Sequence, residues 1–78
     1  MARILDFHEL EKAVRMAVRY LEQKGVIIRD WHIERTLGGG DTLWIVHSDG
    51  LIQKMFLIRD DVNRTAADII EVARKAHH

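Results

Sequence analysis

The sequence contains no cysteine and no proline, and it has no long apolar run. Without cysteine the chain can form neither disulfides nor thiolate metal sites, which fits a reducing compartment such as the cytoplasm. Its apolar runs are far shorter than the ~20 residues that a membrane-spanning helix needs. The first residues also lack the apolar stretch of a secretory signal peptide. The sequence therefore predicts a cytoplasmic protein that does not contact the membrane.

An excess of charge of either sign is also missing, because 12 basic side chains balance 12 acidic ones. The segments 1–25, 26–59 and 60–78 are each close to neutral. Proteins that bind nucleic acid usually concentrate positive charge, since phosphate contacts supply most of their non-specific affinity. The balance of charge therefore makes nucleic-acid binding the less favoured function.

The length and composition indicate one small globular domain over residues 1–78. The chain has 78 residues, of which 47% are hydrophobic, which is too many for a disordered protein. A domain of this size buries only about 60% of its unfolded surface, so its core is thin. The final His77-His78 could be native or the remnant of a purification tag, and the fold and site are interpreted without it.

Residues 6–25 carry the clearest secondary-structure signal. Asp6 and Glu9 have the spacing of a capping box, and Gly25 suits a left-handed helix stop. Apolar residues recur between them at steps of three and four, which is typical of a helix with one buried stripe. The stripe comprises Phe7, Leu10, Val14, Ala17, Val18 and Leu21.

The rest of the chain predicts three strands and a second helix. Residues 26–37 are β-branched and partly alternating, with room for a bulge near Arg29-Asp30. Gly38–Asp41 leads to two apolar runs joined by Asp49-Gly50, a strong hairpin signal. Thr65 and Asp68 form a second capping box, for a helix that ends near Ala76. The order α-β-β-β-α predicts an α+β fold, a three-stranded antiparallel meander with two helices packed on one face.

The hairpin has too few polar residues for a sheet that is wet on one side. A two-residue turn at Asp49-Gly50 would pair Ser48 with Leu51. That register places Leu43, Ile45, His47, Ile52, Lys54, Phe56 and Ile58 on one face, against the helices. It leaves an apolar cluster on the other, open face: Trp44, Val46, Met55 and Leu57.

An exposed apolar cluster of a few hundred Å² starts to imply a partner. The favoured interpretation is that a second copy or another protein covers the cluster, with Trp44, Met55 and Leu57 as anchors. Alternatively, residues 1–5, the glycine loop or a different helix placement could cover it within the chain.

Few residues suggest catalysis, a metal or a cofactor. His8, His32 and His47 lie on three separate elements without zinc-site spacing, so we expect them to be solvated surface residues. Ser48 lies at a hairpin turn rather than at a nucleophile elbow. Asp60-Asp61 precedes a helix, where acids more often serve as turn and cap. The sequence predicts a protein that is not an enzyme and holds no metal or cofactor.

A basic stripe on the first helix supports the alternative function. Lys12, Arg15 and Arg19 follow one another on the side opposite the apolar stripe and could track phosphates. The element order also resembles that of the double-stranded-RNA-binding domain over most of the chain. That family opens its second helix with a Lys-Lys-x-x-Lys-type cluster, whereas the matching residues here are 63–68, Asn-Arg-Thr-Ala-Ala-Asp. The resemblance therefore implies a topology and carries over no RNA-binding residue.

The sequence thus predicts a non-enzymatic interaction module that docks through the open face of its sheet. Its partner would be itself, as a homodimer, or another protein for which it acts as inhibitor or adaptor. Small proteins that dock in this way are frequent among phage and mobile-element products. The alternative is a nucleic-acid-binding module that uses Lys12, Arg15 and Arg19.

Overall fold

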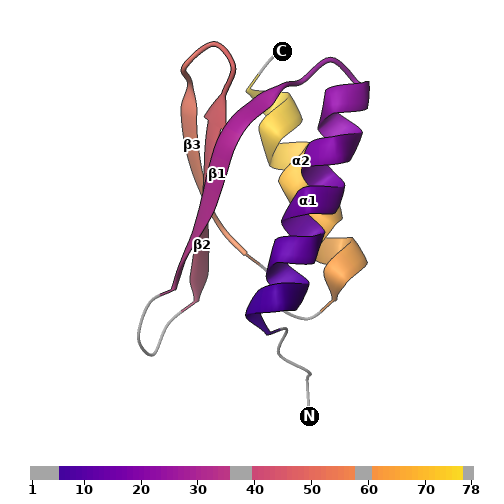
Figure 1. Ribbon diagram of the computed structural model, residues 1–78, viewed down its shortest axis with the longest axis vertical. Coiled ribbons are helices and arrows are strands. Elements are labelled where there is room, and N and C mark those ends of the chain that lie inside the picture. Colours follow the sequence, from indigo (N-terminus) through magenta and orange to yellow (C-terminus); the bar gives the residue numbers. More distant parts are fainter. Residues whose placement is uncertain (1–5, 36–39, 58–60, 77–78) are drawn as a thin grey trace.

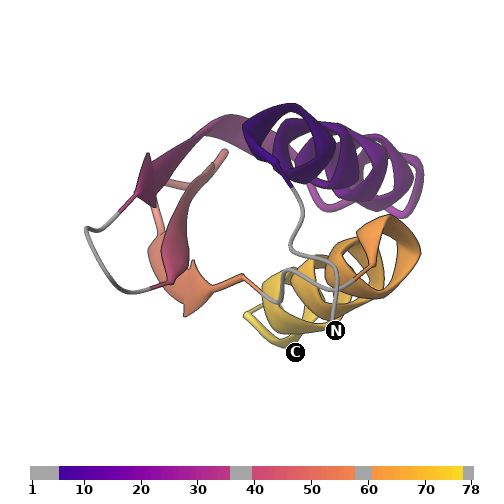
Figure 2. The ribbon, with the colours of Figure 1, turned by 90° about the horizontal axis from the view of Figure 1, so that it is seen from below.

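A computed structural model describes residues 6–35, 40–57 and 61–76. It confirms the α+β fold and the element order α-β-β-β-α. The elements are α1 (Phe7–Gln23), β1 (Ile28–Arg35), β2 (Asp41–His47), β3 (Ile52–Phe56) and α2 (Val62–Lys75). The strands form one antiparallel sheet in the order β1-β2-β3, and both helices lie on the same side of it (Figure 1 and Figure 2).

The predicted capping of α1 is confirmed. Glu9 N–H donates to the Asp6 carboxylate over 2.8 Å, and the Glu9 carboxylate accepts from Asp6 N–H in return. Gly25 follows the helix with φ +85°, the left-handed conformation that glycine adopts at least cost. The cap and the stop therefore fix both ends of α1.

The predicted start of α2 was wrong. Asp61 is its N-cap, accepting from Arg64 N–H over 3.1 Å, and the helix begins at Val62. Thr65 is the fourth residue of the helix, and its hydroxyl donates to the carbonyl of Asp61 over 2.7 Å. A threonine inside a helix can bond back to the preceding turn in this way, so a cap-like spacing does not make it a cap.

The bulge anticipated near Arg29-Asp30 is present in β1. Ile28 pairs with His47 and Asp30 with Val46, so Arg29 is an extra residue without its own partner on β2. Beyond the bulge the pairing is regular to Arg35 and Asp41, whose side chains form an ion pair at 3.3 Å. The bulge reconciles the two halves of this strand, because it shifts the alternation of side chains by one residue.

The turn between β2 and β3 has three residues, Ser48, Asp49 and Gly50. Gly50 N–H donates to the His47 carbonyl over 2.9 Å, and His47 N–H donates to the Leu51 carbonyl over 2.8 Å. Gly50 has φ +94°, whereas φ at Asp49 is not positive. A two-residue type I′ turn needs positive φ at both central residues, so the loop is of the three-residue kind with glycine at its left-handed position.

This turn corrects the predicted register and with it the two faces of β3. His47, not Ser48, lies opposite Leu51, and Leu43 pairs with Met55. A shift of one residue reverses every side chain of a strand. Met55 therefore packs against the core and Leu57 is 7% exposed within it, so their placement on the open face was wrong.

The core lies between the helices and the inner face of the sheet. The burial of Leu43 and Ile45 against the helices confirms their predicted side. The fully enclosed cluster comprises Leu10, Ala13, Val14, Ala17, Leu43, Ile45, Leu57, Ala66 and Ile69. Coverage of the opposite face by residues 1–5 or 36–39 falls outside the described residues.

Two polar side chains of the hairpin also point inward, near the end of α2. His47 is completely buried, which corrects its expected place at the surface. Its Nε2 lies 2.5 Å from Gln53 Oε1, and Gln53 Nε2 donates to the Val72 carbonyl over 3.1 Å. Val72 is in the last turn of α2, where carbonyls lack helical partners. Gln53 therefore ties the hairpin to the end of α2.

Alanine at Gly50 should destabilise the protein by about 1–2 kcal/mol, because an L-residue is strained in the left-handed conformation. Space is not the cause, since an added Cβ would meet nothing within 4 Å at Gly50 or at Gly40. Gly40→Ala is the matched control, as its φ is not left-handed, and it should be neutral or stabilise by up to about 1 kcal/mol. Urea unfolding of both variants measures the two changes in stability. Equal changes would show that the left-handed conformation of Gly50 does not strain an alanine there.

Gln53→Ala should lower the free energy of unfolding by about 1–3 kcal/mol, because it removes a half-buried hydrogen-bond partner of the buried His47 and of the Val72 carbonyl. Gln23→Ala, at an exposed position on α1, should change it by less than about 0.5 kcal/mol. Thermal or urea unfolding measures both. A Gln53→Ala protein as stable as the wild type would show that the link to α2 contributes nothing.

Candidate interaction surfaces

The sheet has an open face, made of three cross-strand rows that point away from the helices. The first row is Glu34, Thr42 and Phe56; the second is His32, Trp44 and Lys54; the third is Asp30, Val46 and Ile52. None of the described helices packs against this side, as the two views show (Figure 1 and Figure 2). We refer to these nine residues as the open face, of which Thr42 is only 4% exposed.

Trp44 lies at the centre of the open face and contacts a neighbour on each adjacent strand. The His32 ring stacks on it with a centroid separation of 6.1 Å and an interplanar angle of 13°. The Lys54 ammonium lies 5.1 Å from the Trp44 ring centroid, within cation–π range. The half-buried Trp44 therefore has a polar side chain against its ring from each adjacent strand.

The most exposed apolar side chains of the open face are on the edge strand β3. Phe56 is 76% exposed and Ile52 60% exposed, and Val46 is half-buried between Asp30 and Ile52. Exposure of two large side chains on one strand, beside a third on β2, is more than scattered surface hydrophobicity.

The open face keeps two of the four predicted interface residues and gains two that sequence reasoning missed. Trp44 and Val46 lie where they were predicted, whereas Ile52 and Phe56 take the positions assigned to Met55 and Leu57. The signal that could have found them is Lys54. The predicted register turned this lysine toward the helices, where an unpaired ammonium costs several kcal/mol.

Charge is distributed unevenly across the open face. Its β1 edge carries Asp30 and Glu34, and its β3 edge carries Lys54. The face therefore presents acidic positions at Asp30 and Glu34 on one edge and a basic one at Lys54 on the opposite edge.

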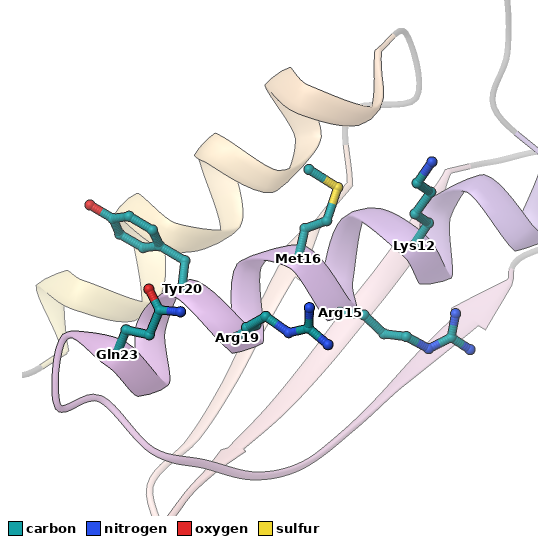
Figure 3. Close-up of a pocket in the computed structure, with 6 residues that line it drawn as sticks. All are labelled: Lys12, Arg15, Met16, Arg19, Tyr20 and Gln23. Atoms are coloured by element: carbon teal, nitrogen blue, oxygen red, sulfur yellow. The ribbon is translucent and has the colours of Figure 1, made fainter.

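The predicted basic stripe lines a groove of about 420 Å³ on the outer side of α1. Lys12, Arg15 and Arg19 share it with Met16, Tyr20 and Gln23, and none of the described lining residues is acidic. Figure 3 shows Arg15 and Arg19 extending to one side of the helix and Met16 and Tyr20 to the other. The structure thus brings the three predicted cations together, next to an exposed aromatic ring.

Glu11 offsets part of the positive charge beside this groove. The Glu11 carboxylate lies 3.7 Å from Arg15 Nη2 and also 3.7 Å from the His8 ring. A surface pair of this kind contributes less than about 1 kcal/mol and does not immobilise the arginine. Arg15 therefore contributes less net positive charge to the groove than Lys12 or Arg19 does.

The described part of the chain contains neither a cluster of metal ligands nor a helix that could cross a membrane. Across residues 6–35, 40–57 and 61–76, no three His, Asp or Glu side chains are grouped closely enough to hold a metal ion. Over the same ranges, neither helix has the length and apolar character needed to cross a membrane. His8 and His32 are exposed as expected, and only His47 departs from the prediction.

The chain matches no protein-family model, and neither the curated proteins nor the solved structures contain a significantly similar relative.

Proposed function

We propose that the protein is an interaction module that self-associates as a homodimer through the open face. The observation that carries the proposal is the exposure of Phe56 and Ile52 beside Trp44 and Val46 on a face that no described helix covers. Aromatic and large aliphatic side chains dominate the centres of protein interfaces. Burying them against a second copy would remove this apolar surface from water.

A second copy fits the open face because the face carries both signs of charge. Lys54 at one edge and Glu34 at the other allow the face to complement itself. A partner with a strongly charged surface would complement only one of the two edges. In a homodimer each chain supplies the same patch to the other, as two-fold interfaces require.

The size of the face sets the expected affinity. Three strands about 4.8 Å apart and five residues long cover roughly 14 by 17 Å. This flat footprint of roughly 240 Å² per chain is smaller than the ~600 Å² per partner at the low end of specific protein complexes. We therefore expect weak association, with dissociation constants on the order of 100 µM, which is reversible and depends on concentration.

Phe56→Ser should shift the wild-type dimer toward monomer by at least about tenfold in dissociation constant, because it removes the most exposed large apolar side chain of the open face from both chains. Its own fold should persist, since Phe56 is 76% exposed in the isolated chain. Tyr20→Ser, which alters an exposed aromatic on α1, is the matched control and should dimerise like the wild type. Sedimentation velocity between about 1 and 500 µM would measure all three.

A wild-type protein that sediments as a 9.1 kDa monomer throughout this range would contradict the proposal. If Tyr20→Ser and Phe56→Ser weakened the dimer equally, the interface would not lie on the open face.

A second candidate function is contact with nucleic acid through the groove on α1. The observation that favours it is that Lys12, Arg15 and Arg19 line one groove together with Met16 and Tyr20. Cationic side chains can contact phosphates while an aromatic ring stacks on an unpaired base. This arrangement suits a single strand, because the groove follows one helix and the rigid Tyr20 ring offers a stacking surface.

Arg15→Glu combined with Arg19→Glu should abolish this binding, and wild-type binding should weaken steeply as salt rises, because phosphate contacts release counterions. The control combines Arg64→Glu with Arg74→Glu, which changes the same charge on α2. Fluorescence anisotropy with a labelled oligonucleotide, at 50 and 200 mM salt, would report both effects. Wild-type anisotropy that stays at the level of the free oligonucleotide would exclude this function.

A further inference from the structure

We infer that the two sheets of the dimer pack face to face around a two-fold axis parallel to the strands, with Lys54 of each chain beside the partner's Glu34. This inference rests on the proposed homodimer and specifies its geometry. It follows from the order of charges across the open face, which the cross-strand register determines.

Two packed sheets keep their strands within about 30° of each other and lie about 10 Å apart. A two-fold axis between such sheets can run along the strands or across them. Along the strands, it places β1 of one chain over β3 of the partner. Across the strands, it places each edge strand over its own copy and reverses the order of the rows. Trp44 lies near the axis in both cases.

An axis across the strands brings like charges together. The middle row contains His32, Trp44 and Lys54, so Lys54 would face the partner's Lys54. Neither lysine would have an acid of the partner next to it, because the acids are on β1 and β1 would face β1. Like charges placed directly opposite each other are destabilising.

An axis along the strands brings opposite charges together. The middle rows again coincide, but Lys54 now faces the partner's His32 and lies one row from each of the partner's two acids, Glu34 and Asp30. One row is about 7 Å along a strand, which a lysine side chain can span. Two such contacts form, one on each side of the axis. The exposed Ile52 and Phe56 meanwhile cover the polar β1 edge of the other chain.

The charges also explain the orientation without a buried ion pair. Lys54 and Glu34 are at the edges of the sheet, so they remain at the rim of the interface, where charge selects a partner's orientation more than it adds affinity. Trp44 and Val46, which face their own copies near the axis, supply the apolar contact, and the rim charges choose between the two axes.

Charge reversal tests the axis. Lys54→Glu alone places two acids together at both contacts, and Glu34→Lys alone places two lysines together. Each should weaken its own homodimer by roughly tenfold, the product of two exposed pairs. An equimolar mixture of the two variants should form heterodimers at nearly wild-type affinity, because one contact is native and the other is reversed. Native mass spectrometry of a mixture in which one variant is 13C-labelled counts homodimers and heterodimers directly.

The matched control mixes Lys75→Glu with Glu71→Lys, which exchanges an exposed pair on α2 whose charged atoms are 3.2 Å apart within one chain. This mixture should give the statistical proportion of heterodimer. An axis across the strands predicts a different result, with Lys54→Glu pairing preferentially with the wild type, and that preference would overturn the inference. A statistical mixture of Lys54→Glu and Glu34→Lys would overturn it as well. Wild-type protein found only as monomer would overturn the dimer itself.

Discussion

The left-handed backbone of Gly50 is the constraint on which the two faces of the sheet depend. It closes a three-residue loop after His47 and so determines which residue of β3 lies opposite each residue of β2. One residue more or less in this loop would reverse β3. As the loop stands, Met55 and Leu57 join the core, and Lys54 points away from it. The β3 residues of the open face, Ile52, Lys54 and Phe56, follow from this one turn.

The same register decides which face of the hairpin each polar residue occupies. The inner face takes the apolar residues together with His47 and Gln53, whose hydrogen bonds reach the last turn of α2. These two polar groups are therefore satisfied inside the protein and do not dilute the open face. What remains outside is Trp44 held between His32 and Lys54, with exposed apolar residues on β3. A small domain with a thin core has a low free energy of unfolding. Covering such an apolar surface would therefore stabilise it by a comparatively large amount.

The sequence was sufficient for the element order, both ends of α1, the bulge in β1 and the inward side of β2, because each of these leaves a local pattern. The sequence was insufficient for the start of α2 and for the loop between β2 and β3, because in each place the same residues fit two local structures. Thr65 has the spacing of a cap, yet the acid before it, Asp61, takes that role. Asp49-Gly50 suits a two- or a three-residue loop, and the choice depends on whether Lys54 or Met55 is buried, which is a tertiary question. Trp44 and Val46 were found because β2 was oriented correctly, and Ile52 and Phe56 were missed with the register. The groove on α1 was foreseen in its charges but not in the proximity of Tyr20.

The central claim is that a second copy of the chain covers the open face. Isotope-filtered NOE spectroscopy tests it most directly, on a mixture of 13C-labelled and unlabelled wild-type protein at a concentration well above the expected dissociation constant. The account predicts intermolecular NOEs between the methyl groups of Val46 or Ile52 and aromatic protons of the partner's open face. Intermolecular NOEs that involve only α1 or α2 would contradict the account.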